Sequence, residues 1–175
     1  MKYKKFIIII FALLVILFVY LFSNKYVKVA SDSDKKVLIE HSFLSSKGNF
    51  NYKGIVLFDD GTIYSWNSTD EVAYSKLTNM YEKSLWIIKN GSKSKKRIGK
   101  NTLKKIKEYI DNLNDDNTKT EYKGTNEGIT SIKVWDYKDA KYFILEESGD
   151  YETLNESKES KKIIKFTNKN LKIKE

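Results

Sequence analysis

Residues 55–66, IVLFDDGTIYSW, carry the clearest structural pattern of the chain. Two runs rich in β-branched and aromatic residues, Ile55–Phe58 and Thr62–Trp66, flank the triplet Asp59-Asp60-Gly61. An Asp-Gly pair between two such runs is typical of a tight β-hairpin, because glycine accepts the positive φ that the turn needs. This stretch therefore predicts two antiparallel strands.

Further strands are predicted on both sides of this hairpin. Val37–Ser45 alternates in a way that places Val37, Ile39, His41 and Phe43 on one face. The short apolar run Leu85–Lys89, LWIIK, predicts another strand, which ends at Asn90-Gly91. A second hairpin is predicted from two runs of alternating character, Ile129–Asp136 and Lys141–Glu147.

Three helices are also predicted. Ser68 and Glu71 match the capping box S-x-x-E and start a helix whose apolar face reaches Tyr81. Apolar residues spaced at i, i+3, i+7 and i+10 predict a helix over Thr102–Leu113. Asn155 is a suitable N-cap for a last helix that ends near Asn168. The polar stretches between these elements, 92–100 and 115–128, are predicted as loops.

The predicted order contains hairpins and no regular β-α-β alternation. It therefore predicts an α+β fold, in which an antiparallel sheet is built from hairpins and two or three helices pack on one face of it. One transmembrane helix is predicted to precede this domain.

That helix is the uninterrupted apolar run FIIIIFALLVILFVYLF at residues 6–22. It follows a basic tail, residues 1–5, and spans roughly 25 Å at about 1.5 Å per residue. A cleaved signal peptide is the main alternative, but such peptides have shorter apolar regions and a small-residue cleavage site. We predict an uncleaved signal-anchor, a spacer at residues 23–36 and a globular domain at 37–175.

Lysines flank both ends of this run, so the positive-inside rule does not set its orientation. A short basic tail before an apolar run is the order found in export signals. The predicted location is therefore the cell membrane, with a single pass and an extracytoplasmic domain.

Composition excludes several chemistries. The chain has no cysteine, which rules out disulfides, thiol nucleophiles and Cys-ligated metals, and His41 is the only histidine. No serine or acid is visibly placed to work with His41, so it is interpreted as a structural strand histidine. We predict no catalytic residue, no metal site and no cofactor. A hydrolase that uses carboxylates such as Asp59-Asp60, Asp115-Asp116, Glu146-Glu147 or Asp150 with Glu152 stays an alternative.

The charge distribution provides the one candidate binding site. The chain has a net charge of +9, and residues 89–107 contain nine basic residues and no acidic one. This segment predicts an anionic partner, such as lipid headgroups or a wall polymer. The alternative is a solvated surface in a chain whose lysine content reflects an AT-rich genome. Nucleic acid is not predicted, because arginine is nearly absent. The predicted binding residues are Lys93, Lys95, Lys96, Arg97 and Lys100.

Three stretches, KYKKFIIII, GIVLFDDGTIYSW and GDYETLNESKESKKII, give the chain a layout that resembles small uncharacterised exported, membrane-anchored proteins of low-GC Gram-positive bacteria. The resemblance implies neither an activity nor site residues. The sequence thus predicts a non-enzymatic binding module at the cell envelope, for an anionic surface or a protein partner. A hydrolase and an immunity or inhibitor protein are the alternatives.

Overall fold

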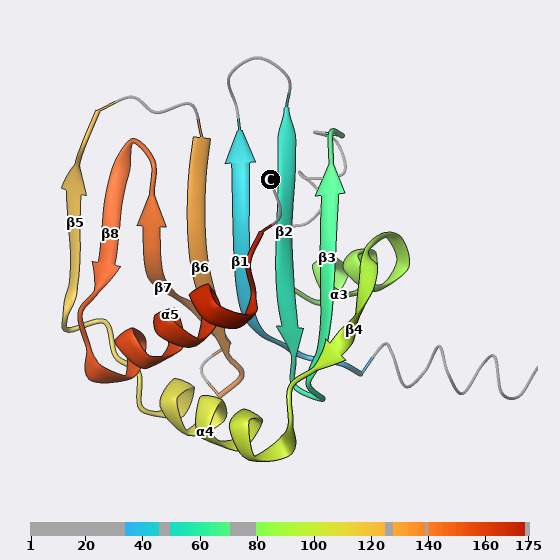
Figure 1. Cartoon of the computed structure of the whole chain (residues 1–175). Coiled ribbons are helices and arrows are strands. Elements are labelled where there is room, and N and C mark those ends of the chain that lie inside the picture. The colour runs from blue at the N-terminus through green and yellow to red at the C-terminus, as the bar shows by residue number, and fades with distance from the viewer. Residues whose placement is uncertain (1–33, 46–49, 71–79, 125–127, 139, 174–175) are drawn as a thin grey trace, which may run out of the picture. The chain divides into compact units, whose positions relative to one another are not determined.

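A computed structural model describes residues 34–45, 50–70, 80–124, 128–138 and 140–173 (Figure 1). The chain divides into two compact units, Met1–Asp34 and Lys35–Glu175, and the described residues fall almost entirely in the second. The predicted tail, anchor and capping residue Glu71, and nearly all of the spacer, lie outside them. No helix within the described ranges is long and apolar enough to span a membrane.

One antiparallel sheet organises the second unit (Figure 1). The described residues form eight strands in the order β4-β3-β2-β1-β6-β7-β8-β5, so β4 and β5 are the two edges. The prediction of an α+β fold with an antiparallel sheet built from hairpins is confirmed. The strands are β1 Val37–Ser45, β2 Asn51–Phe58, β3 Thr62–Ser68, β4 Ser92–Arg97, β5 Thr118–Tyr122, β6 Gly128–Asp136, β7 Lys141–Ser148 and β8 Tyr151–Asn155.

Both predicted hairpins are present. β2 pairs with β3 around Gly61, whose φ of +88° requires glycine, and a Cβ there would collide with the carbonyl oxygen of Ile98. β6 pairs with β7, and Asp136 lies opposite Lys141 at the turn end. Both pairs of strands are therefore antiparallel neighbours in the sheet, as the local sequence predicts.

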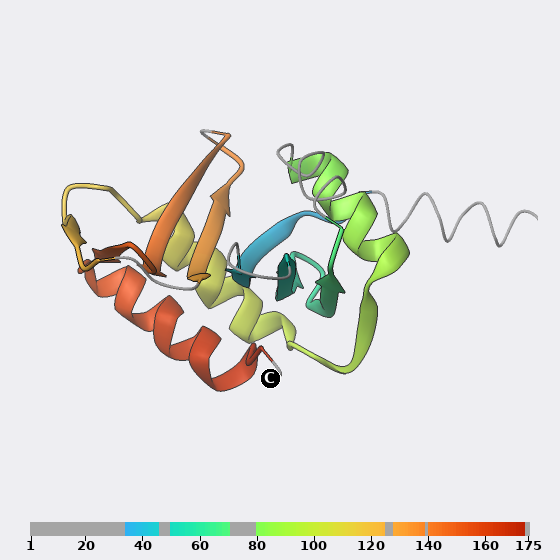
Figure 2. The same cartoon turned by 90° about the horizontal axis from the view of Figure 1, so that it is seen from above.

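The described helices cover both faces of the sheet, which corrects the prediction of packing on one face (Figure 2). α4 (Lys100–Asp111) and α5 (Lys158–Asn170) lie on one face, and α3 (Met80–Asn90) lies on the other. Adjacent β2 residues explain why: Leu57 belongs to the core under α4 and α5, and Phe58 belongs to the core under α3. Because both faces of the central strands are apolar, both need a helical cover.

A β-bulge also changes the faces predicted for β1. The pairing of β1 with β2 shifts register between Val37 and Ile39. Val37 therefore joins the core under α3, while Ile39 joins the core under α4 and α5. The predicted common face thus holds from Ile39 onward and fails at Val37.

The sequence LWIIK, predicted as a strand, lies inside α3. Ile87 is buried in the core under this helix, and Trp86 and Ile88 pack against it. A short apolar run fits a buried strand and a buried helical turn equally well, so this pattern could not distinguish them, and the predicted strand is wrong.

Two segments predicted as loops contain edge strands. All six residues of β4, SKSKKR, are exposed, and β5 within residues 115–128 is nearly as exposed. β8 was also missed, and Asn155, predicted as a helix N-cap, is its last residue. The N-cap of α5 is Ser157, whose hydroxyl accepts a hydrogen bond from the Ser160 amide at 3.1 Å. Ser68 is the last residue of β3, and its hydroxyl accepts a hydrogen bond from the Asp70 amide at 3.2 Å; the helix predicted to start there lies largely at residues outside the described ranges.

Candidate functional site

An open groove lies on the face of the sheet that carries α4 and α5, where these helices leave β2, β3 and β4 uncovered. Its main pocket has a volume of about 660 Å³ and is bordered by the segment after α5, residues 171–173. A second pocket of about 440 Å³ shares Lys53, Lys172 and Ile173 with it. The two pockets therefore form one groove along the C-terminal segment.

The lining of this groove is basic. His41, Lys53, Lys93, Lys95 and Lys172 all border it, and none of the described residues that line its two pockets is a carboxylate. Uncharged hydrogen-bonding side chains complete the polar lining: Ser65, Asn67, Asn90, Ser92, Ser94, Thr130 and Asn168. This composition provides donors and positive charge, which suits an anion.

His41 holds one side of the C-terminal segment in place. Its Nδ1 lies 2.8 Å from the carbonyl oxygen of Leu171. A carbonyl oxygen only accepts, so Nδ1 carries the proton of this hydrogen bond. Leu171 itself is fully buried in the core under α4 and α5. The histidine therefore ties β1 to the residue from which the groove wall starts.

Lys96 holds the other side. Its Nζ donates to Oδ1 of Asn170 at 3.0 Å, which links edge strand β4 to the end of α5. The C-terminal segment is thus attached to the sheet on both sides of the groove, at β1 and at β4.

The predicted binding residues do not form one patch. Lys95 lines the groove, and Lys96 bonds to Asn170 beside it. Lys93 borders the groove, but its Nζ lies 5.9 Å from the centre of the Tyr64 ring, which belongs to the core under α3. Lys100 is the first residue of α4 and borders a different pocket, which includes Glu108 and Asp111.

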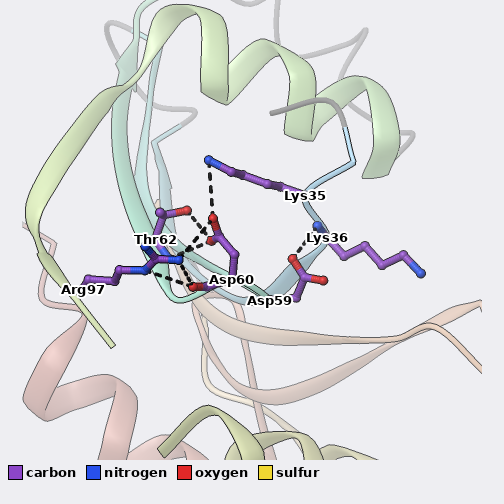
Figure 3. Close-up of polar contacts among 6 residues, drawn as sticks. All are labelled: Lys35, Lys36, Asp59, Asp60, Thr62 and Arg97. Atoms are coloured by element: carbon purple, nitrogen blue, oxygen red, sulfur yellow. Dashed lines mark hydrogen bonds and ion pairs between the residues drawn. The ribbon is translucent and has the colours of Figure 1, made fainter. Parts of the chain in front are cut away.

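Arg97 has a structural role at the β2–β3 turn (Figure 3). Its Nε and Nη2 donate to the carbonyl oxygen of Asp60 at 3.1 and 2.7 Å. The Asp60 carboxylate accepts hydrogen bonds from Thr62 N and Oγ1 at 2.8 and 2.6 Å, and lies 3.5 Å from Lys35 Nζ. Burial raises the pKa of Asp60, but the hydrogen bonds from Thr62 and the charges of Lys35 and Arg97 outweigh it and lower that pKa. Arg97 therefore fastens β4 to the turn.

Sequence reasoning missed Lys53 and Lys172. They lie on β2 and after α5, far apart along the chain, and the lysine-rich C-terminal stretch around Lys172 shows no link to β2 in the sequence. Lysines at these places have no local pattern, so only the fold brings them to the same groove.

Three of the other carboxylates proposed for catalysis take part in separate ion pairs. Asp115 contacts Lys141 at 3.8 Å, Glu147 contacts Lys133 at 3.8 Å and Glu152 contacts Lys123 at 3.4 Å. No group of three or more His, Asp or Glu within the described residues is arranged to hold a metal. None of these observations specifically favours the hydrolase alternative, which stays a prediction.

No known protein family, curated protein or solved structure matches this chain. The choice among functions therefore depends on the chemistry of the groove.

Proposed function

We propose that this chain is a single-pass membrane protein, anchored by residues 6–22, whose extracytoplasmic domain is a non-enzymatic binding module for a ligand with phosphodiester groups. One observation supports this most directly: the groove is bordered by a histidine and several lysines, and no carboxylate is among its described lining residues. The proposed site keeps Lys95 from the predicted binding residues and adds Lys53 and Lys172, which the sequence analysis did not include.

The groove chemistry fits phosphate oxygens. Lysine ammonium groups bind phosphate as point charges, and neighbouring amide and hydroxyl groups add hydrogen bonds. Lys95 and Lys172 form no ion pair within the described part of the chain, so no described carboxylate offsets their charge. A volume of about 660 Å³ lies within the range of small-ligand sites, and the open ends admit a polymer or a headgroup.

Phosphodiesters at a cell envelope have two sources, the headgroups of anionic phospholipids and wall polymers of phosphate-linked polyols. The chemistry that the groove would recognise is shared by both. An experiment has to separate them.

Binding is tested with the full chain in a nonionic detergent, passed over immobilised poly(glycerol phosphate). The test variant combines Lys53→Gln, Lys95→Gln and Lys172→Gln. If each lysine contributes about 1 kcal/mol, the triple variant should bind roughly a hundredfold more weakly. The matched control removes the same charge from the exposed side of α4: Lys104→Gln, Lys105→Gln and Lys107→Gln. It should bind like the unmodified chain.

The source of the ligand is identified by competition. Mixed micelles that contain phosphatidylglycerol displace the polymer if a lipid headgroup is preferred, and they have little effect if the polymer is preferred. Equal binding by the groove variant and the α4 control would contradict the proposal, because it would show that only net charge matters.

A further inference from the structure

Among the described residues, β5 forms one edge of the sheet and pairs on one side only, with β8. It pairs with β8 through Lys123 N to Asp150 O and through Glu156 N to Asn117 O, both at 3.0 Å. Backbone groups alternate along an antiparallel strand, so the odd-numbered residues face β8 and the even-numbered residues face outward. The bond from Thr118 N to Asp115 O agrees with this, because it leads away from β8. Thr120 and Tyr122 therefore direct their backbone N–H and C=O groups to the free edge.

The sequence of this strand, TKTEY, is complementary to itself in antiparallel pairing. If a two-fold axis passes between Thr120 and the partner's Thr120, these two residues exchange both backbone hydrogen bonds. Tyr122 N–H then donates to the carbonyl oxygen of the partner's Thr118. The same register places Lys119 directly opposite the partner's Glu121 and places Glu121 opposite the partner's Lys119. Within one chain Lys119 lies 2.6 Å from Glu156 and Glu121 lies 2.9 Å from Lys123, so each pair across the axis would extend an existing ion pair.

The side chains at this edge also favour the addition of a second strand. Tyr122 and Tyr151 are 64% and 56% exposed, and their ring centres lie 5.3 Å apart in an edge-to-face arrangement. They stand beside the free edge as an exposed aromatic pair. A second strand laid along β5 would shield part of the Tyr122 ring from water.

The opposite edge of the sheet is protected from the same pairing. Two copies of β4, SKSKKR, laid antiparallel about Lys95 place Lys95 opposite the partner's Lys95, and Lys93 opposite the partner's Arg97. Like charges directly across two strands are unfavourable, and lysines on an edge strand are a common protection against sheet extension. The two edges therefore differ: self-pairing places like charges opposite each other at β4 and opposite charges opposite each other at β5.

We propose that two copies of this chain associate through β5, so that their sheets join into one continuous antiparallel sheet. The occupant of this edge is a second copy because backbone register and charge both match under the same two-fold axis. A five-residue strand buries little area, so the association is weak and depends on concentration. This proposal is independent of the groove, which lies toward the β4 edge of the sheet.

The first test uses the absence of cysteine from the chain. Thr120→Cys in the full chain introduces a single thiol at the proposed axis, where paired Cα atoms lie about 5.5 Å apart, within the range of about 4.4–6.8 Å that a disulfide spans. Ser94→Cys on β4 is the matched control. Mild oxidation in nonionic detergent should give a covalent dimer from Thr120→Cys and much less from Ser94→Cys. Equal yields, or no dimer from Thr120→Cys, would overturn the proposal.

The second test exchanges the paired charges. Lys119→Glu and Glu121→Lys each place like charges across the axis, so each variant should raise the dimer dissociation constant by roughly tenfold or more. An equimolar mixture of the two restores opposite charges at both positions and should form a mixed dimer. Sedimentation measures each mass, and circular dichroism checks the fold of each variant.

Failure of the mixture to associate, although the unmodified chain does, would show that β5 is not the interface. A chain that remains monomeric at every concentration would also overturn the proposal. A Thr120→Cys chain that cross-links to a different polypeptide instead of itself would favour strand addition by another protein and would equally overturn it.

Discussion

The structural role of His41 depends on a contact that only the fold creates. It lies half-buried on β1, and its partner, the carbonyl oxygen of Leu171, is 130 residues further along the chain. The sequence shows no nucleophile or acid placed to work with it, and it gives no sign of this partner. The only histidine of the chain therefore positions the groove wall, and its removal tests that role.

We expect His41→Ala to lower the free energy of unfolding by about 1–2 kcal/mol, because it removes one hydrogen bond and part of the packing beside the core. Urea denaturation of the full chain in detergent measures the change. His41→Gln is the control, because its carboxamide can donate to the same carbonyl oxygen and should recover part of the loss. An unchanged denaturation midpoint for His41→Ala would show that the bond to Leu171 contributes nothing.

At the scale of elements, α3 is attached to the sheet by a buried ion pair. Lys83 Nζ on α3 lies 2.6 and 2.7 Å from the two carboxylate oxygens of Glu40 on β1, and the Tyr52 hydroxyl donates to Glu40 at 2.9 Å. Burial alone raises the pKa of Glu40. The charge of Lys83 and the hydrogen bonds from Lys83 and Tyr52 outweigh burial, so the pKa lies below its ordinary value of 4.5.

We expect Lys83→Met to cost about 3–5 kcal/mol at neutral pH, because it leaves Glu40 charged and unpaired inside the protein. The pH dependence should also change sign. In the unmodified chain the pair stabilises the fold above pH 4.5, and this contribution is lost as the pH falls through the lowered pKa of Glu40. In the variant, the hydrogen bond from Tyr52 and the charge of Lys133 still lower the pKa of Glu40, but both contributions of Lys83 are lost. We therefore expect burial to raise this pKa and the loss of stability to shrink as the pH falls.

Chemical denaturation across a pH series measures both effects. The double variant Lys83→Met with Glu40→Gln is the control, and it should recover most of the stability at neutral pH because no buried charge remains. A Lys83→Met variant that is as stable as the unmodified chain at pH 7 would show that the pair does not hold α3.

Elements with strong local patterns were predictable, and elements that depend on partners were not. The β2–β3 hairpin is predictable from IVLFDDGTIYSW and α4 from its apolar spacing, because a turn and an amphipathic face are local properties of the sequence. The segments SKSKKR and TKTEY form strands only because β3 and β8 present free edges to them. Their side chains are exposed, so no apolar alternation marks them in the sequence.

The whole molecule explains why the candidate site was only partly predictable. The segment rich in lysine is predicted to bind an anion, but the side chains of β4 take part in different contacts: Lys96 bonds to Asn170, Lys93 lies over Tyr64 and Arg97 bonds to Asp60. The groove instead combines β1, β2, β4 and the segment after α5. Proximity of this kind follows from strand order, which no local pattern encodes.

The anchor is the last property of the whole molecule to be tested. The continuous apolar sequence of the chain is residues 6–22, whereas the apolar side chains that form the core of the second unit are packed in two internal clusters. We therefore expect deletion of residues 1–25 to give a soluble, folded protein, while the full chain sediments with membranes. Cell fractionation and the cooperative melting of the truncated protein measure the two outcomes.

A salt wash distinguishes membrane attachment through the anchor from electrostatic attraction through the lysines of the groove. At about 0.5 M salt the Debye length falls to roughly 4 Å, so attraction between lysines and anionic headgroups is largely screened, whereas burial of an apolar helix in lipid is not. The truncated protein should therefore associate with anionic membranes weakly at low salt and leave them in the wash, and the full chain should remain bound in both conditions. If the truncated protein still sediments with membranes after the wash, residues outside 1–25 hold it there by apolar contacts, and the single-anchor proposal is wrong.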